Sequence, residues 1–304
     1  MAQLPPIKCD CGTTIESEAF VPNARGGATT ASDFFSCLRR CNTCGIGFSN
    51  AKNPSDVQKI LRDPFAGLPA YIAEGSESAL NNCLNRAHAA AKRIQFHSFG
   101  SEDHVTWTVI RLLQHERLLG PAFRHPGLEP VLLVWGVSVP NDCTAGQALR
   151  DRVINVLNGL GEEQDYRTEP DVVLDFGSAG IVIIEAKLFS LNESQSESYG
   201  GWSKYLIHSA FRDPECAHAT GLYQLVRNWR LGTELAGERP FTLFNLAPEF
   251  AGNERTGLAR LRLAFRTSPQ RRFVLRRWSG LLSGFVIPDW FSEYARQRSV
   301  PIAQ

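Results

Sequence analysis

Two adjacent strands with charged ends constrain this chain more than any other feature. The stretch EPDVVLDFGSAGIVIIEAKL, from Glu169 to Leu188, consists of two apolar segments around a glycine-containing turn. Short segments rich in Val and Ile predict the buried strands of a β-hairpin. Yet Asp171 opens the first strand, and Glu185 and Lys187 close the second. Because an unpaired charge costs several kcal/mol to bury, these groups must be solvated, paired or retained for a function.

The register of this hairpin decides whether Asp171 and Glu185 share a face. If they lie opposite each other, the connection is a three-residue loop followed by Gly180, and glycine suits the bulge position of such loops. A two- or four-residue loop would place Asp171 opposite Ala186 and send the two carboxylates to opposite faces. The sequence permits the first register without requiring it.

Two carboxylates on one face favour a hard divalent cation, which supplies the missing positive charge. Phosphoryl-transfer sites commonly hold Mg²⁺ with one or two carboxylates and a substrate phosphate. Such an ion polarises the phosphate and lowers the pKa of its bound water. Lys187 lies two residues after Glu185 and therefore on the same face, where an ammonium can orient that water or stabilise charge on the phosphate.

The order Pro170-Asp171, a spacer, and Glu185-Ala186-Lys187 on an apolar strand resembles the PD-(D/E)XK nuclease superfamily. The resemblance covers roughly residues 99–250. It implies an α/β protein with the restriction-endonuclease-like fold, a mixed central sheet flanked by helices, with the two motifs on neighbouring strands. It also implies that Asp171, Glu185 and the Ala186 carbonyl bind Mg²⁺ or Mn²⁺, and that Lys187 assists the attacking water. A hairpin with solvated charged ends is the alternative.

The same resemblance adds two candidate catalytic residues. Many members carry a metal-linked acidic residue on the helix before the sheet, and Glu102, or in second place Asp103, begins a helix predicted over 100–120. Acidic residues are also favoured there by the helix dipole alone. Some members carry a Q-x-x-x-Y motif on the helix after the sheet strand, predicted here over 219–235. Gln224 matches it, but Asn228 stands where the Tyr would be.

Five of the eight cysteines lie in the first 44 residues. Cys41-x-x-Cys44-Gly has the spacing of a zinc knuckle, and Cys9-x-Cys11-Gly is a less usual first pair. Together they predict a closed, structural Zn²⁺ site with four thiolates, which could fold a module too small for its own core. Cys37 is the alternative ligand, in place of Cys9 or Cys11, or is simply buried. Free buried thiols are the competing explanation for the cluster.

A formal net charge of +1 conceals a basic C-terminal end. Residues 251–304 contain ten Arg, no Lys and three acidic residues. Residue spacing predicts amphipathic helices here, one of them capped by Ser268 with Pro269 in its first turn. Arginines on such helices would make bidentate contacts to a phosphate backbone, unless the helices are merely solvated. The candidates for nucleic-acid binding are Arg262, Arg266, Arg271, Arg272 and Arg276.

We therefore expect four parts: a zinc-binding module over 1–60, a helical linker over 61–98, a nuclease core over 99–250, and an Arg-rich helical C-terminal part packed on the core over 251–304. No apolar run approaches the roughly 20 residues that a membrane span needs, and the N-terminus lacks an apolar signal core. The expected location is the cytoplasm, without membrane contact.

The expected function is that of a Mg²⁺-dependent endodeoxyribonuclease in restriction, defence or DNA processing. RNA stays open as a substrate, because phosphate and metal chemistry do not discriminate it from DNA. Cutting both strands often requires two active sites, so a homodimer is a natural expectation. The alternatives are a non-catalytic nucleic-acid-binding protein on the same fold and an interaction or scaffold protein built on the zinc module.

Overall fold

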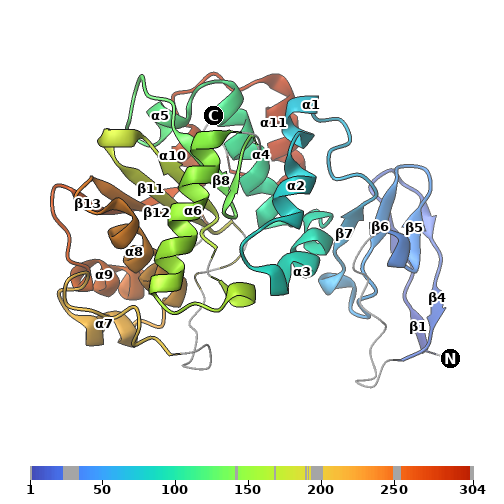
Figure 1. The fold of residues 1–304 in the computed structure, drawn as a ribbon. Coiled ribbons are helices and arrows are strands. Elements are labelled where there is room, and N and C mark those ends of the chain that lie inside the picture. Colours follow the sequence, from blue (N-terminus) through green and yellow to red (C-terminus); the bar gives the residue numbers. More distant parts are fainter. Residues whose placement is uncertain are drawn as a thin grey trace. The chain divides into compact units, whose positions relative to one another are not determined.

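The computed structural model describes residues 2–22, 34–140, 143–167, 169–188, 190, 192, 201–248 and 255–301 (Figure 1). The chain forms two compact units. The first consists of Met1–Pro69 and Ala90–Val105, and the second of Ala70–Ala89 and Thr106–Gln304. The first unit thus contains the whole of the expected zinc-binding module and part of the expected linker. The boundary falls inside two helices, α3 (Arg86–Phe96) and α4 (Glu102–His115).

Short strands dominate the first unit. Strand β1 (Ala2–Leu4) pairs with β4 (Glu18–Phe20), and β2 (Ile7–Lys8) pairs with β3 (Thr14–Ile15). A three-stranded sheet consists of β5 (Arg39–Cys41), β6 (Ile46–Phe48) and β7 (Lys59–Leu61). Three apolar clusters among its described residues contain only two to four buried side chains each. So little buried apolar surface stabilises a fold weakly, which is the situation in which a metal ion contributes folding free energy.

The described residues of the second unit form six strands: β8 (Val131–Val134), β9 (Val137–Ser138), β10 (Val172–Asp175), β11 (Ile181–Ala186), β12 (Phe241–Ala247) and β13 (Arg271–Arg277). They form one sheet in the order β13-β12-β11-β10-β8-β9. The strands from β9 to β11 pair antiparallel, whereas β12 is parallel to β11 and β13 is parallel to β12. The predicted α/β class with a mixed sheet is therefore confirmed.

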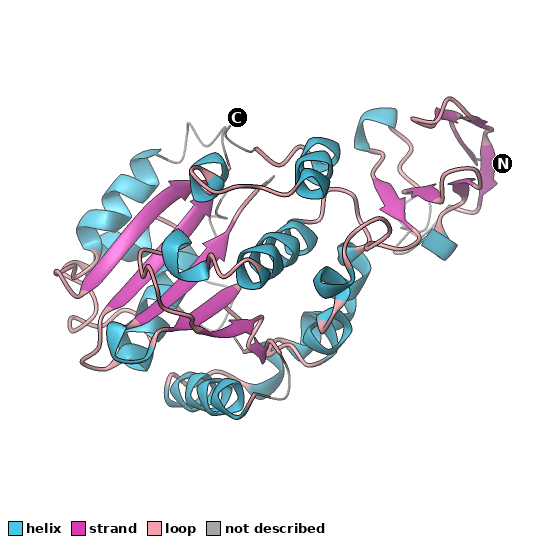
Figure 2. Cartoon of the chain, turned by 90° about the horizontal axis from the view of Figure 1, so that it is seen from above, coloured by secondary structure: helices cyan, strands magenta, loops and turns pink. Residues whose placement is uncertain are grey.

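Helices lie on both sides of this sheet (Figure 2). On one face, Val173, Ile183 and Leu243 belong to a large apolar core with residues of α6 (Thr144–Gly159) and α8 (Tyr223–Ala236). On the other face, the ring of Phe244 meets that of Phe123 with centroids 5.2 Å apart. The remaining helices are α1 (Ala70–Ala73), α2 (Ser76–Asn81), α5 (Leu119–Ala122), α7 (Pro214–Ala219), α9 (Arg255–Ala264), α10 (Trp278–Leu282) and α11 (Asp289–Arg298). No described helix is long and apolar enough to cross a membrane.

The hairpin adopts the three-residue loop. Val172 pairs with Ile184 and Asp175 with Ile181. The N–H of Phe176 donates to the carbonyl of Gly180 at 2.9 Å, which closes the turn over 177–179. Gly180 has φ +122°, and a Cβ there would lie 2.4 Å from the Pro240 carbonyl oxygen. Only glycine fits both conditions, so this residue fixes the register.

The expected helix after Ser268 is wrong. Residues Arg271–Arg277 form β13, and a helix of five residues, α10, follows only at Trp278. Ser268 and Arg271 instead exchange backbone hydrogen bonds of 3.0 and 3.1 Å in a tight turn. The sequence RRFVLRR contains aromatic and β-branched residues and buries Phe273, so pairing with the open edge of β12 outweighs its helical spacing.

Candidate functional site

Asp171 immediately precedes β10, and the pairing of Val172 with Ile184, continued by one residue, places Asp171 opposite Glu185 at the end of β11. The carbonyl of Asp171 accepts a hydrogen bond of 3.0 Å from Trp135 N–H, so its backbone faces β8 rather than β11. Opposite residues that do not exchange backbone hydrogen bonds approach most closely, with Cα atoms about 4.5 Å apart. The two carboxylates are therefore brought together on one face of the sheet.

The carboxylate of Glu185 is buried and fully engaged. Its side chain is 2% exposed, and Oε1 lies 2.9 Å from Nζ of Lys187. Oε2 accepts a hydrogen bond of 2.7 Å from Nδ2 of Asn228 in α8. A buried ion pair seldom increases stability over an apolar pair of similar volume, because the desolvation cost offsets the attraction. A gain in stability alone therefore does not explain the pair at this position.

Asp171 is half-buried and contacts the second strand directly. Its Oδ2 accepts a hydrogen bond of 2.8 Å from the backbone N–H of Ala186. In a strand, the N–H and C=O of one residue point towards the same neighbouring strand, so the Ala186 carbonyl lies on the Asp171 side. Asp171, Glu185 and this carbonyl supply the oxygen ligands that Mg²⁺ or Mn²⁺ prefers. The donor set fits such an ion.

Two further side chains from β12 and the loop after β11 complete this polar cluster. Asn245, fully buried, stands beside Glu185 in the sheet register and donates from Nδ2 to the Glu185 carbonyl at 3.3 Å. Asn192 and Asn245 also exchange two side-chain hydrogen bonds of 3.1 and 3.2 Å. Sequence reasoning missed Asn192, Asn228 and Asn245. The available signal was an Asn inside the apolar segment FTLFNLA of β12.

Gln224 lies one helical turn before Asn228 on α8, so the two amides share a face of that helix. Neither Oε1 of Gln224 nor Oδ1 of Asn228 has a hydrogen-bond partner among the described residues, although both atoms are buried. Buried acceptors are normally satisfied, so both are poised to accept a hydrogen bond from water or from a ligand.

Glu102 begins α4, as predicted, but it belongs to the first compact unit. The hairpin carboxylates belong to the second. Asp103, the second-choice residue, pairs with Lys92 at 3.1 Å. Asp103 therefore has a structural partner, while a site role for Glu102 stays a prediction.

Four thiols converge in the first unit. The Sγ atoms of Cys9, Cys11, Cys41 and Cys44 all lie within 4.8 Å of one another, with Cys9 to Cys44 at 3.2 Å and Cys11 to Cys41 at 3.5 Å. Zinc–sulfur bonds of about 2.3 Å place tetrahedral sulfurs about 3.8 Å apart. These four cysteines could therefore hold a metal ion such as zinc.

Two tight turns present these thiols. The N–H of Gly12 donates to the Cys9 carbonyl at 2.9 Å, and that of Gly45 to the Cys41 carbonyl at 3.0 Å. A hydrogen bond from the Cys44 backbone lowers the pKa of the Cys41 thiol to about 6, whereas burial raises the pKa of Cys44 to about 12. A bound cation would favour the thiolate at every position.

Cys37, the alternative ligand, packs elsewhere. It forms a separate buried cluster with Phe34 and Ile60, and a Cβ on Gly47 would lie 2.6 Å from its Sγ. The four converging thiols do not include it. Its surroundings are those of a packing residue.

The five candidate arginines do not form one helical face. Arg262, Arg266 and Arg272 are exposed. Arg271 donates to the carbonyls of Gly237 and Arg239, and Arg276 to those of Ala122 and Gly280. In the sheet register, Arg271 and Arg272 pair with Phe241 and Thr242, at the opposite end of the sheet from Glu185. Arg266 likewise donates from Nε to the His208 carbonyl at 2.9 Å. The predicted helical face is wrong for Arg271, Arg272 and Arg276, which lie in β13, while nucleic-acid binding by the five arginines stays a prediction.

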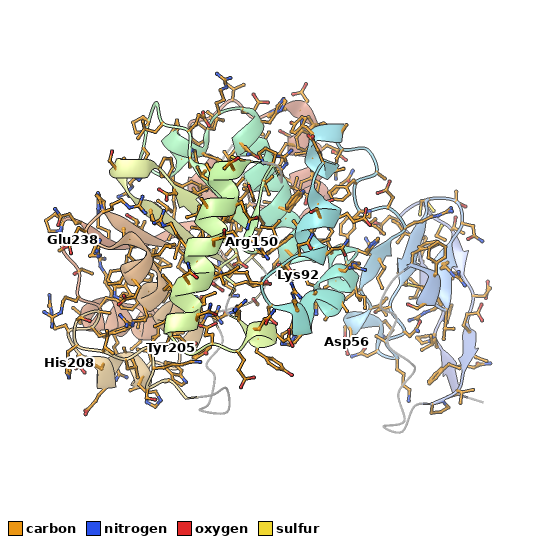
Figure 3. All side chains as sticks on the ribbon, in the orientation of Figure 1. Asp56, Lys92, Arg150, Tyr205, His208 and Glu238 are labelled. Atoms are coloured by element: carbon orange, nitrogen blue, oxygen red, sulfur yellow. The ribbon has the colours of Figure 1, made fainter. Side chains whose placement is uncertain are left out.

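Two hollows border α7, away from the carboxylates. One, of about 480 Å³, is lined by Trp202, Ser203 and His218 among others. The other, of about 710 Å³, includes His208, which is labelled in Figure 3. Neither is lined by a residue of the hairpin. They therefore share no lining residue with the hairpin cluster.

No protein-family model matches this chain, and comparison with curated proteins and with solved structures gives no match either. Any function must therefore be argued from the geometry of the two clusters described above, the hairpin carboxylates and the four thiols.

Proposed function

We propose that this protein is a metal-dependent nuclease of the PD-(D/E)XK type that hydrolyses DNA phosphodiester bonds, in restriction, defence or DNA processing. One observation carries the proposal. Asp171, Glu185 and Lys187 meet at one end of the hairpin, in the register that makes the motif productive, and Glu185 is a buried carboxylate. The mixed sheet supports the proposal, because Asp171 and the Glu-Ala-Lys segment stand on neighbouring strands.

Each residue has a part in this chemistry. Asp171, Glu185 and the Ala186 carbonyl would hold Mg²⁺ or Mn²⁺. When bound, the ion would polarise the scissile phosphate and lower the pKa of its water. Lys187 would orient the attacking water or stabilise negative charge on the phosphate. Asn228 holds Oε2 of Glu185 and so fixes the rotamer of that carboxylate.

The four thiols would bind structural Zn²⁺. A closed site with four cysteines leaves no open position for a substrate, so zinc would contribute folding free energy rather than catalysis. The small apolar clusters of the first unit are consistent with this role.

Cleavage assays test the catalytic proposal. Supercoiled plasmid, linear duplex and single strands would be incubated with Mg²⁺, with Mn²⁺ or without added divalent ion. Asp171→Ala and Lys187→Ala should each reduce the rate by at least about 100-fold. Asp165→Ala and Lys204→Ala remove the same charges outside the cluster and should cleave like the wild type. Cutting that survives Asp171→Ala and Lys187→Ala would rule this site out.

One observation favours a second candidate, a non-catalytic nucleic-acid-binding protein. Both oxygens of Glu185 are already satisfied by Lys187 and Asn228, as expected of a closed structural network. This alternative predicts salt-sensitive binding that is indifferent to Mg²⁺ and to Lys187→Ala. Mg²⁺-dependent cleavage by the wild type would decide against it.

A further inference from the structure

The first unit repeatedly places a cation over a phenylalanine ring. In its described residues Lys52 lies over Phe20, Arg40 over Phe34, Lys59 over Phe99 and Arg62 over Phe35, at 5.4 to 6.0 Å from the ring centroids. Basic and aromatic side chains arranged in this way suit nucleic acid, because phosphates bind the cations and bases stack on the rings. The two arginine pairs are close together.

Strand register places these two arginine pairs on one face of the β5-β6-β7 sheet. Arg40 lies opposite Gly47, and Gly47 lies opposite Ile60. Phe34 and Cys37 pack on Ile60. Arg62 lies two residues after Ile60 and therefore on the same face of the sheet. Its guanidinium lies over the ring of Phe35. The Phe35 ring meets that of Phe34 edge-to-face, with centroids 5.6 Å apart.

Phe35 is the exposed member of this group. Its side chain is 69% exposed, whereas Phe34 beside it is 7% exposed and anchors the segment. Arg40 and Arg62 are both exposed. The exposed Phe35 ring has the Arg62 guanidinium over it, and the Arg40 guanidinium lies over the adjacent Phe34 ring. Such a ring offers a stacking platform with anion-binding groups beside it.

We propose that Phe35, Arg40 and Arg62, here called the Phe35 surface, bind single-stranded nucleic acid. A base stacks on the Phe35 ring, and the flanking phosphates contact the two arginines. Single strands are the substrate class because a base inside a duplex has no free face to offer. The inference rests on the proposed nuclease function, for which this surface would hold a single-stranded substrate or a frayed duplex end.

Fluorescence anisotropy tests the surface on the full-length, zinc-loaded protein without divalent cations. The probes are labelled single strands of 20 thymidines and of 20 uridines, with a duplex of the same length. Phe35→Ala should weaken single-strand binding roughly tenfold, and Phe35→Trp should retain it. Arg62→Gln should reduce the slope of log K against log salt by about 0.7. Val21→Ala, which truncates an apolar side chain that is 86% exposed on the same unit, is the matched control.

The outcomes separate this surface from the catalytic proposal. If Phe35→Ala binds single strands as tightly as the wild type, or if polyglutamate competes as well as the oligonucleotides, the Phe35 surface is ruled out. Stronger binding of thymidines or of uridines would identify DNA or RNA as the ligand. Binding that needs Phe35 in a protein that does not cleave would retain the surface and reject the nuclease. If Phe35→Ala cleaves with an unchanged KM, the nuclease proposal is retained and the Phe35 surface is rejected.

Discussion

Asn228 of α8 donates a hydrogen bond of 2.7 Å to Oε2 of Glu185, the buried carboxylate at the end of β11. The residue that departs from the Q-x-x-x-Y pattern is thus the one that holds the central acidic group. Asn228 is itself fully buried, so this hydrogen bond joins α8 to the end of β11 inside the protein.

Replacing Asn228 should destabilise the protein. Asn228→Leu leaves Oε2 of Glu185 buried without its donor, which costs about 1–3 kcal/mol. Urea denaturation monitored by circular dichroism would measure the loss. Asn158→Leu changes a mostly exposed Asn on α6 and should be close to neutral. Equal stability of the two variants would contradict the assigned role of Asn228.

Lys187 is the counter-ion of Glu185 when no metal is bound. Lys187→Met removes it and should lower the free energy of unfolding by roughly 3 kcal/mol. Saturating Mg²⁺ should restore part of this loss, because the divalent ion supplies the missing positive charge. Thermal unfolding with and without Mg²⁺ would show the effect. Lys204→Met is the control. If Mg²⁺ raises the melting temperature of Lys187→Met no more than that of Lys204→Met, no metal binds at this site.

Metal removal should unfold the first unit. Cys41→Ser should lose the zinc ion and the structure of the β2–β3 and β5–β6 turns, since metal binding and folding are coupled in such modules. Cys37→Ala should retain one zinc per chain and lose only about 1 kcal/mol of packing. Atomic absorption measures the zinc content. Loss of zinc from Cys37→Ala would reinstate Cys37 as a ligand.

Gly180 sets the hairpin register, so its replacement should be costly. Gly180→Ala brings a Cβ within 2.4 Å of the Pro240 carbonyl oxygen at φ +122°, and should cost about 3 kcal/mol. Gly237→Ala is the matched control, because Gly237 also has positive φ (+57°) but open space around it. The control should lose less stability than Gly180→Ala, because it adds backbone strain at φ +57° and ψ −122° without a steric clash. Chemical denaturation of both variants measures the difference.

His125 should make stability depend on pH. The ring of His125 stacks on that of Phe176, with centroids 4.2 Å apart. Burial lowers the pKa of His125, and the nearby positive charge of Arg272 lowers it further. A depressed pKa means that the folded protein prefers the neutral ring. Stability is therefore lost as pH falls through and below the unfolded value of about 6.5. From pH 7.5 to 5.5, the unfolding free energy of the wild type should fall relative to that of His125→Phe, which has no ring to protonate. Chemical denaturation of both proteins at each pH measures this difference.

Local chemistry explains which features could be predicted from the sequence. The hairpin follows from its apolar segments and from Gly180, and the four converging thiols follow from their spacing. The hairpin depends on residues near in sequence, whereas the thiols form two close pairs that zinc chemistry requires to meet. The contacts of Asn228 and Asn245 with Glu185 depend on how α8 and β12 pack, which no short pattern encodes. Likewise, β13 is a strand because β12 offers it an edge.

The strand β13 lies at an edge of the sheet, a position where charged side chains have a physical consequence. It is the last strand of the sheet, so one side of its backbone has no neighbouring strand in the described sheet. Such an edge invites strands of other molecules to add to it, and charged side chains discourage that addition. Arg271, Arg272, Arg276 and Arg277 place four positive charges along this seven-residue strand. They would keep the sheet from growing into aggregates as the chain folds.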